Sequence, residues 1–377
     1  MSRSGYDELA AVRPVLAAIT PADAEAVAAA WRRQHSLTKP RGSLGRLETV
    51  GARLAGIAGR CPPPVPEPVA VALFAADHGV HAQRVTPWPQ QVTGQMVANL
   101  AAGGAVANAF ARQLDASVRV VDVGIAFPGA RSVPGVLQRR VRPGTADMTD
   151  EPAMSRTQAV AAVQVGVAVG RELVTAGNRL LVAGEMGIAN TTASAALVAT
   201  FCGLGAVEVT GRGTGMDDTT LARKVEVVDT ALALHRPDPG DPVGVLARVG
   251  GLEHAAIAGL LLAAAASRVP VVLDGVSTNA AALVAQAMAP PAVDHWIAGH
   301  RSTEPGAAAA LRHLGLSALI DLDLRLGEGS GALLAVPLVQ AAARVLSEVA
   351  TYESAGVSER PVGEVSTTET TEGTGSQ

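Results

Sequence analysis

Aromatic side chains are scarce in this sequence and make up 2% of its 377 residues. Proteins that bind single-stranded nucleic acid stack its bases on such rings. Neither sign of charge predominates, because the formal net charge is -4. The 30 Lys and Arg residues are scattered along the sequence rather than gathered into a basic patch. A polyanion needs such a patch. We therefore expect a small-molecule ligand and no nucleic-acid partner.

Cysteine is nearly absent. Cys61 and Cys202 are the only two, which is typical of a reducing compartment and excludes a zinc site built from cysteines. Charged residues such as Asp7 and Arg13 interrupt the N-terminal segment, which therefore lacks the apolar stretch of a signal peptide. The longest fully apolar run, residues 255–266, is shorter than the roughly 20 residues of a membrane helix and predicts a buried helix. These features predict a cytoplasmic protein without membrane contact.

Aliphatic residues are abundant, and the chain is long enough for a large domain with a smaller partner. Residues 1–60 are predicted to give a helical segment of the small domain, with Thr20 as a cap and Pro21 in a first turn. The proline-rich residues 61–66 predict a linker. A last helix over about 335–352 is expected to return to the N-terminal helices. Residues 353–377 contain no Leu, Ile or aromatic side chain and are predicted to be disordered.

Residues 65–334 are predicted to form an α/β catalytic domain. Short Val/Ile/Leu runs alternate with Ala-rich stretches of helical length, and the strand candidates are 69–75, 118–123, 179–183, 269–273, 293–298 and 316–322. Continuous apolar strands separated by helices are typical of a parallel sheet covered on both faces. The predicted fold class is therefore α/β, a doubly wound, mostly parallel, Rossmann-like sheet with a small helical second domain from the N- and C-terminal segments.

Polar residues and glycines follow the predicted strands. They are Asp77-His78-Gly79, Gly124, the turn at 184–192, Asp274-Gly275, Gly299-His300-Arg301-Ser302 and, after Asp323, Gly327-Glu328-Gly329-Ser330-Gly331. In a doubly wound fold the ligand lies beyond the carboxyl ends of the strands, where the order of winding switches. We expect these residues to meet at one edge of the sheet and to form the site.

The turn at 184–192 joins a predicted strand to a predicted helix. Its glycines let backbone N–H groups approach a ligand, and such a helix start suits a phosphate. The alternative is that Asn190 or a threonine only caps the helix. The turn matches neither a Walker A loop nor a dinucleotide fingerprint. A second glycine-rich loop, 211–215, precedes Lys224, which taken alone would be a solvated surface charge.

Glu328 stands between two glycines, just before Ser330 opens the last helix. One interpretation is an exposed acid favoured by the helix dipole. The other is a general base held where a substrate comes close. An apolar pocket would raise the pKa of this carboxyl and the helix dipole would lower it, and the sequence leaves that balance open.

Histidine invites a metal assignment at His78, His81, His295 and His300. No helical or hairpin spacing brings three of them together, so no metal site is predicted. His78 is instead expected to form a hydrogen-bonded structural pair with Asp77.

Several segments together resemble one family. They are 38–48 (TKPRGSLGRLE), 76–80 (ADHGV), 184–192 (GEMGIANTT), 274–279 (DGVSTN) and 327–332 (GEGSGA). These motifs are similar to those of the nicotinate-nucleotide:5,6-dimethylbenzimidazole phosphoribosyltransferases, and the resemblance covers residues 35–345 in the same order.

The resemblance implies transfer of ribose 5-phosphate from nicotinate mononucleotide to 5,6-dimethylbenzimidazole, giving α-ribazole 5′-phosphate for cobalamin nucleotide-loop assembly. It implies that Glu328 is the general base and that Glu185 and Lys224 belong to the same catalytic site. Phosphate and ribose are then expected at Gly187, Ile188, Asn190, Thr191, Thr192, Gly213 and Ser302, and the base at Thr86 and Gln91. The resemblance also implies a homodimer.

The implied chemistry needs no cofactor. Nicotinate is a pyridinium in its nucleotide, so it leaves as a neutral ring nitrogen without acid catalysis, and one base is enough. Attack from the opposite face passes through an oxocarbenium-like state that a carboxylate such as Glu185 would stabilise. Transferases that use a pyrophosphate donor bind magnesium, commonly through paired acids after a strand. Residues 271–275 contain one acid, Asp274, so no metal is expected.

Two other functions compete with this interpretation. A Rossmann-type oxidoreductase would suit the architecture, but the Gly-x-Gly-x-x-Gly motif after an early strand is missing. A non-catalytic metabolite-binding protein would share the fold, because fold does not dictate activity. The sequence also leaves open whether other lower-ligand bases are accepted.

Overall fold

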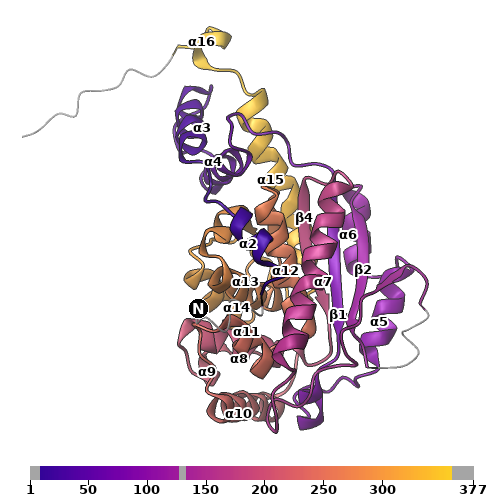
Figure 1. Cartoon of the computed structure of the whole chain (residues 1–377). Coiled ribbons are helices and arrows are strands. Elements are labelled where there is room, and N and C mark those ends of the chain that lie inside the picture. The colour runs from indigo at the N-terminus through magenta and orange to yellow at the C-terminus, as the bar shows by residue number, and fades with distance from the viewer. Residues whose placement is uncertain (1–8, 127–132, 359–377) are drawn as a thin grey trace, which may run out of the picture.

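One parallel sheet organises the computed structural model, which describes residues 9–126 and 133–358 (Figure 1). In these residues its strands are β1 Val69–Ala76, β2 Ser117–Gly124, β3 Val136–Gln138, β4 Leu180–Met186, β5 Val271–Leu273 and β6 Trp296–Ala298. Their order is β3-β2-β1-β4-β5-β6, and every neighbouring pair is parallel. The predicted doubly wound α/β fold is confirmed, and the winding reverses between β1 and β4.

The predicted strand at 316–322 is wrong. This segment pairs through a single bridge between Ile320 and His300, at the carboxyl end of β6. The strand β3 was not predicted, because three residues carry too little pattern to recognise. β5 starts after Pro270, and β6 starts only after the 3-10 helix η3 at Pro290–His295, so both are shorter than expected.

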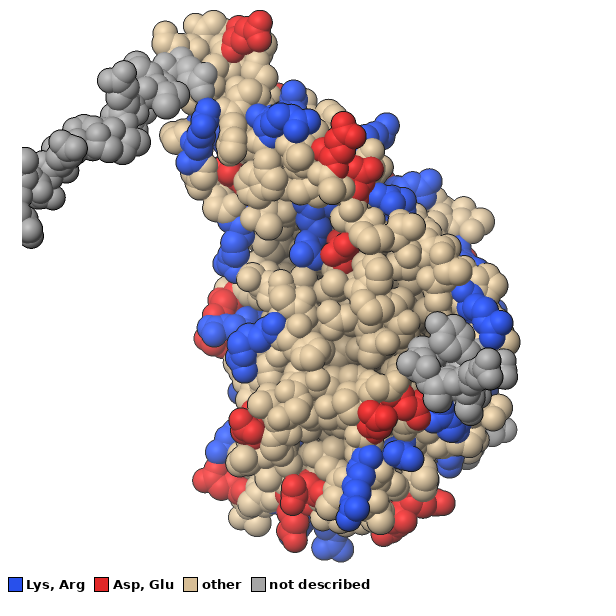
Figure 2. Space-filling model, turned by 60° about the vertical axis from the view of Figure 1, so that its left-hand side comes forward, with Lys and Arg blue, Asp and Glu red and all other residues tan. Residues whose placement is uncertain are grey.

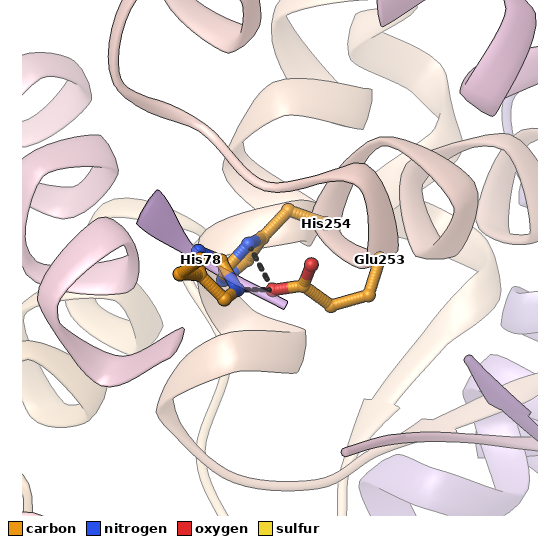
Figure 3. A group of neighbouring side chains, drawn as sticks. All are labelled: His78, Glu253 and His254. Carbon is orange, nitrogen blue, oxygen red and sulfur yellow. Dashed lines mark hydrogen bonds and ion pairs between the residues drawn. The ribbon is translucent and has the colours of Figure 1, made fainter. Parts of the chain in front are cut away.

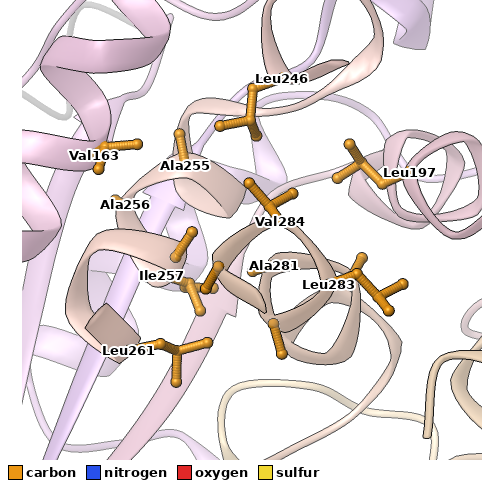
Figure 4. Packing of buried hydrophobic residues seen from close by; sticks show 14 of the residues in the cluster. Val163, Leu197, Leu246, Ala255, Ala256, Ile257, Leu261, Ala281, Leu283 and Val284 are labelled. Carbon is orange, nitrogen blue, oxygen red and sulfur yellow. The ribbon is translucent and has the colours of Figure 1, made fainter. Parts of the chain in front are cut away.

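Helices cover both faces of the sheet, and β1 shows why. Ala70, Ala72, Phe74 and Ala76 face one core, whereas Val69, Val71, Leu73 and Ala75 face the other, as the alternation of a strand requires. The first core contains α7 Arg156–Thr175, α8 Asn190–Cys202, α12 Leu252–Ala266 and α13 Val276–Met288, and part of it appears in Figure 4. The second contains α5 Val92–Ala101, α6 Val106–Gln113 and α15 Ser330–Glu348.

Further helical elements add buried residues to the first core. They are η1 Gly79–Gln83, α9 Ala206–Val209, α10 Asp218–His235, α11 Pro242–Val249 and α14 Pro305–His313. The helix predicted from the apolar run at 255–266 is α12, and it is buried along nearly its whole length.

Helices α7 and α12 approach each other very closely. A Cβ atom added at Gly166 of α7 would lie 1.7 Å from the carbonyl oxygen of Ala256, and one added at Gly259 of α12 would lie 2.0 Å from that of Val163. The backbones therefore touch where each helix places a glycine. Small side chains replace aromatic bulk in this core.

A small helical unit stands at one end of the larger domain (Figure 1). It contains α3 Ala24–Ser36 and α4 Arg46–Ala58, and these pack on the last turns of α15, where a Cβ added at Gly51 would lie 3.0 Å from the Ala342 carbonyl oxygen. The expected cap at Thr20 is wrong, because the side chain of Asp23 accepts the Ala26 N–H and α3 starts after it. A preceding short helix, α2 Arg13–Ala18, lies in the segment predicted to be helical, but its Val15 packs in the core of the larger domain.

The predicted disorder from residue 353 onward is wrong at its start. Helix α16, Tyr352–Ala355, is capped by Thr351, and the Tyr352 hydroxyl donates to the Lys39 carbonyl at 3.1 Å. A short bridge between Leu37 and Thr351 joins the same segments. The rest of the predicted tail, 359–377, lies outside the described residues.

Helix α15 is the one helix in the described part of the chain that is long and apolar enough, by length and composition, to cross a membrane. Core helices pass the same test. Here α15 packs with Leu333, Val336 and Val339 in the core behind the sheet, so its apolar face is already used.

Acidic and basic side chains are interspersed on the face shown in Figure 2, and the middle of that face carries few of either. No field of a single sign covers this side of the described protein, in line with the scattered charge in the sequence.

Candidate active site

The carboxyl ends of β4, β5 and β6, together with the segment between η1 and α5, surround a cavity of about 270 Å³ at the point where the winding reverses. Its lining is mostly apolar, with a few polar side chains, as expected for a small-molecule site. The lining residues are Thr86, Trp88, Val92, Met96, Glu185, Met186, Gly187, Ile188, Ala189, Asn190, Thr191, Gly213, Thr214, Met216, Gly275, Val276, Ser277, His300, Ser302, Glu304, Arg325, Leu326, Gly327 and Glu328.

Most of the predicted site residues meet in this cavity. Glu328, Glu185, Gly187, Ile188, Asn190, Thr191, Gly213, Ser302 and Thr86 all line it. Lys224, Thr192 and Gln91 do not. Lys224 and Thr192 are buried behind the wall, and Gln91 is exposed at the start of α5.

Glu328 projects from the loop before α15, and 2% of it is exposed. The φ angle of Glu328 is +61° and that of Gly329 is +77°. This left-handed backbone conformation is unfavourable for a residue with a side chain, so surrounding contacts must hold Glu328 in it. Burial raises the pKa of this carboxyl, a hydrogen bond from the Ala107 backbone lowers it, and the charge of Asp274 raises it, with a net increase. Its Oε2 atom is buried and has no hydrogen-bond partner in the described residues. The balance that the sequence left open therefore favours a stronger base.

Glu185 stands at the end of β4 and faces the same cavity. Burial and the charges of Asp274, Glu253 and Glu328 raise its pKa well above the usual range, against a hydrogen bond from Asn190 that lowers it. Gly327 leaves room for this carboxylate, because a Cβ there would lie 2.3 Å from Glu185 Oε1. The cavity thus holds an excess of acid, which favours a cationic ligand.

Lys224 of α10 is fully buried rather than solvated. Its Nζ donates to Thr191 Oγ1 at 2.8 Å and to the Gly211 carbonyl at 3.0 Å. Burial lowers its pKa to about 8, while Glu304 acts in the opposite direction. Lys224 therefore connects the start of α8 with the glycine-rich loop at 211–215 from behind the wall.

The same glycine-rich loop is held from two sides. The Gly213 N–H donates to Glu304 Oε1 at 2.7 Å. On the other side, the indole of Trp88 donates to Thr214 Oγ1 at 2.9 Å, and Trp88 is 49% exposed at the cavity mouth. The segment 86–91 thus borders the cavity through Thr86 and Trp88 rather than through Gln91.

The sequence placed Asp274 and His300 at this edge of the sheet without giving either a role, and it did not point to Glu304. His300 and Glu304 line the cavity, and Asp274 lies behind Glu328 with both oxygens bonded to backbone N–H groups. Their position could have suggested a role, because Asp274 and His300 follow predicted strands just as Glu185 does.

A buried polar cluster of His78, Glu253 and His254 is shown in Figure 3, and the His78 ring lies next to Gly187 of the cavity lining. His78 Nε2 and His254 Nδ1 both lie 2.8 Å from Glu253 Oε1. The predicted pair of His78 with Asp77 is wrong, because the ring bonds to Glu253, which is 175 positions away. Burial alone would lower the pKa of His78, but Glu253 and Asp77 outweigh it and raise it.

The cluster continues to the start of α8. His254 Nε2 lies 2.8 Å from Ser194 Oγ, which donates to the Asn190 carbonyl at 2.9 Å. Burial would raise the pKa of Glu253, yet the two histidines hold it well below its usual range. A buried ion pair therefore supports the helix that opens on the cavity.

Among the described residues, His78, Glu253 and His254 are the group whose ligand atoms lie close enough together to suggest a metal. Both N···O distances are hydrogen-bond lengths. Two ligands of one zinc ion, each about 2.1 Å from it in tetrahedral geometry, would lie roughly 3.4 Å apart. Both observed distances are shorter than that, so they fit ion-pair contacts better than a set of metal ligands, and the contact of His78 is also a hydrogen bond.

Comparison with known proteins identifies the family. A family model described as "Phosphoribosyltransferase" matches residues 19–357. The chain belongs to this phosphoribosyltransferase family. It is therefore an enzyme that transfers a pentosyl group, and the oxidoreductase alternative is not favoured.

Individual relatives agree with the family. The phosphoribosyltransferase is 59% identical over 359 residues to the nicotinate-nucleotide–dimethylbenzimidazole phosphoribosyltransferase of Salinispora tropica, covering 91% of this chain and 98% of the relative. It is 54% identical to the protein of the same name from Chloroflexus aggregans, covering 91% and 96%. A crystal structure of the Thermus thermophilus protein of that name superposes with a TM-score of 0.84 at 48% identity, covering 90% and 100%.

Proposed function

We propose that this phosphoribosyltransferase moves ribose 5-phosphate from nicotinate mononucleotide to 5,6-dimethylbenzimidazole, releasing nicotinate and α-ribazole 5′-phosphate. The observation that carries the proposal is Glu328, a carboxylate of raised pKa with one oxygen that has no hydrogen-bond partner in the described residues, set in a mostly apolar cavity. The names of the relatives point to the same two substrates.

The acid excess of the cavity suits the donor. Nicotinate mononucleotide carries a positive ring, and Glu185 and Glu328 line the wall that would face it, with Asp274 behind. As the ring leaves, positive charge moves to the sugar, and the same carboxylates stabilise it there. We propose that Glu185 gives up its proton when the cationic ring binds.

The phosphate end is proposed to lie at the start of α8. Gly187, Asn190 and Thr191 line the cavity there, and Ser302 and Gly213 face them from two other loops. The positive end of the helix dipole favours an anion at this point. Lys224 would support the phosphate from behind through Thr191.

The transfer releases one proton, and one acceptor, Glu328, is enough to take it. The bond from the sugar C1′ to the nicotinate nitrogen breaks, and its electron pair leaves with the ring. One nitrogen of dimethylbenzimidazole bonds to C1′ from the opposite face, which inverts the configuration. Glu328 takes the proton from the other ring nitrogen, so that a neutral benzimidazole is attached to the sugar.

We also propose that the enzyme is a cytoplasmic homodimer. Cys61 and Cys202 are both free thiols, which suits a reducing compartment. Leu322 and Leu326 are large apolar side chains, 58% and 44% exposed, and Leu326 lies at the cavity. Covering them by a second subunit would remove apolar surface from water. Sedimentation analysis of the full chain tests the dimer.

The test of function is direct. The purified enzyme is incubated with nicotinate mononucleotide and a panel of benzimidazoles, purines and phenolics, and nucleotide products are read by mass. We expect α-ribazole 5′-phosphate from dimethylbenzimidazole. If this product is absent and another base in the panel is converted, that base and not dimethylbenzimidazole is the acceptor. Nucleotide binding without any product would favour the non-catalytic alternative.

A further inference from the structure

We propose that Asp274 is a positioning residue for the reaction, holding the backbone that carries Glu328. Asp274 follows β5, and 2% of it is exposed. Its Oδ2 accepts the Gly329 N–H at 3.2 Å, and its Oδ1 accepts the Ala332 N–H at 3.0 Å. These donors are the residue next to Glu328 and the first turn of α15, so one carboxylate fixes both ends of the turn.

The turn needs such an anchor because its backbone is in a disfavoured conformation. Both Glu328 and Gly329 have positive φ, and a residue with a side chain holds that conformation only where its surroundings enforce it. On the opposite side, a Cβ added at Gly184 would lie 2.8 Å from the carbonyl carbon and oxygen of Glu328. The backbone of the base is therefore clamped between the end of β4 and Asp274.

Asp274 is itself held in place by β6. His300 Nε2 lies 3.3 Å from Asp274 Oδ1. The imidazole fits there only because Gly331 has no side chain, since a Cβ at that position would lie 2.1 Å from His300 Cδ2. Three strand ends thus converge on the turn that carries Glu328.

Asp274 also acts through its charge. The groups that face Glu328 are Asp274 at β5, Glu185 at β4 and the Ala107 N–H of α6, with His300 beside Asp274. Burial and the Asp274 charge raise the pKa of Glu328, whereas the Ala107 hydrogen bond lowers it. Removing the charge of Asp274 therefore shifts the ionisation of the base to lower pH.

The first experiment is Asp274→Asn in the full chain, with kcat, KM and the pH profile measured per folded enzyme. This test rests on the proposed role of Glu328. We expect kcat to fall roughly 10- to 100-fold, the scale of a misplaced catalytic group, with KM for nicotinate mononucleotide changed much less. The acid limb of the kcat profile should move to lower pH.

The matched control is Asp122→Asn. Asp122 is also a buried aspartate at a strand end, where Oδ1 accepts the Gly124 and Ile125 N–H groups and Oδ2 binds Arg140. It does not line the cavity. This variant should lose thermal stability while its acid limb stays in place. A merely structural Asp274 would behave in the same way, and that result would overturn the proposal.

A double-mutant cycle separates this proposal from the role of Glu328 itself. If Asp274 acts through Glu328, the double variant Asp274→Asn/Glu328→Gln should be no slower than Glu328→Gln. If the kcat losses of the two single variants instead multiplied in the double variant, the proposal would be overturned. Wild-type activity in Glu328→Gln alone would instead overturn the function proposed for Glu328. Should Asp274→Asn not fold, Asp274→Glu keeps the charge and displaces the turn, so a wild-type kcat in that variant would also overturn the proposal.

Discussion

Glu185 and Glu328, two of the glutamates that line the cavity, are expected to be in different protonation states before substrate binds. Glu328 has a moderately raised pKa and one free oxygen, whereas the pKa of Glu185 is raised well above its usual range by burial and three neighbouring acids. We therefore expect Glu185 to stay protonated to higher pH than Glu328, the proposed base. Pairs of carboxyl groups whose environments separate their pKa values commonly divide acid and base tasks.

Replacing the base gives the sharpest prediction at this scale. Glu328→Gln should lower kcat by about 10²-fold or more, the range for a lost general base, with KM changed much less. The wild-type profile should lose activity as the pH falls through the raised pKa of Glu328, above the usual 4.5. The residual activity of Glu328→Gln should not show this loss at low pH. Steady-state kinetics of both proteins from pH 4 to 8 test the difference, and the same loss of activity in the variant would contradict the prediction.

Glu185→Gln should raise thermal stability while lowering kcat. A carboxyl whose pKa is raised in the folded state stabilises the fold fully only below its unfolded pKa, and this contribution is lost as the pH rises. At neutral pH the wild type bears the cost of keeping the group protonated, and glutamine does not. The melting temperature of the variant should exceed that of the wild type at pH 7.5, with the difference vanishing near pH 4. A variant less stable than the wild type at both pH values would contradict this ionisation state.

The sequence could locate these residues but could not predict their electrostatics. Glu328 was found because two glycines flank it before a helix. The rise in its pKa comes first from burial and then from the charge of Asp274, which lies 54 positions earlier and reaches Glu328 only through the sheet. Lys224 shows the same limit, because a lysine between polar neighbours on a helix is expected in solvent and is here fully buried.

At the scale of elements, the start of α8 depends on a charge buried in α12. Glu253 binds His78 and lies beside His254, and the chain of contacts ends at the Asn190 carbonyl through Ser194. A buried ion pair is weak evidence for stability by itself, but removing one partner leaves an uncompensated charge. A substitution that removes one charge therefore tests the contribution of the network to stability, whereas the presence of the ion pair alone does not.

Glu253→Gln should reduce the free energy of unfolding by about 3 kcal/mol or more. The lowered pKa of Glu253 means that its contribution is lost as the pH falls below the usual 4.5, and the raised pKa of His78 means that its contribution is lost as the pH rises above 6.5. The loss should thus be largest between these values. Denaturant titrations at pH 4, 5.5 and 8 test this. Glu172→Gln, which breaks an exposed pair with Arg139, is the control and should change stability by about 1 kcal/mol or less. An equal loss in both variants would argue against the buried network.

The elements themselves were largely predictable, and their partners were not. An aspartate next to a histidine suggested a local pair, yet the ring turns to a glutamate that only the packing of α12 brings near. The segment 316–322 had the composition of a strand but meets β6 at one bridge. In both cases the local pattern was correct about polarity and wrong about the neighbour.

At the scale of the molecule, the shortage of aromatic residues has a visible counterpart. The main core is filled by Ala, Val and Leu, so helices must come close together to leave no voids. Gly166 and Gly259 allow α7 and α12 to touch through their backbones. The composition predicted small core residues, although it could not tell which helices would meet.

A graded pair of substitutions tests this contact. Gly166→Ala places a methyl group 1.7 Å from the Ala256 carbonyl oxygen, where backbone must move, whereas Gly170→Ala places one 3.0 Å from the Ala263 methyl group. Alanine is the better helix former by about 1 kcal/mol, so a gain would be expected from propensity alone. We expect Gly166→Ala to lose roughly 1–3 kcal/mol and Gly170→Ala to lose less, measured by chemical denaturation. A more stable Gly166→Ala variant would disprove the close approach.

The position of α15 has one more consequence. Its first residue, Ser330, follows the turn that carries Glu328, and its last turns support α3 and α4, where Arg33 donates to the Leu346 carbonyl. A helix of 19 residues is a rod of about 28 Å. Glu328, the proposed base, therefore lies at one end of α15, and α3 and α4 pack at the other. A change in the packing of α3 and α4 would be transmitted along this helix, past Pro337, to the position of the Glu328 carboxylate.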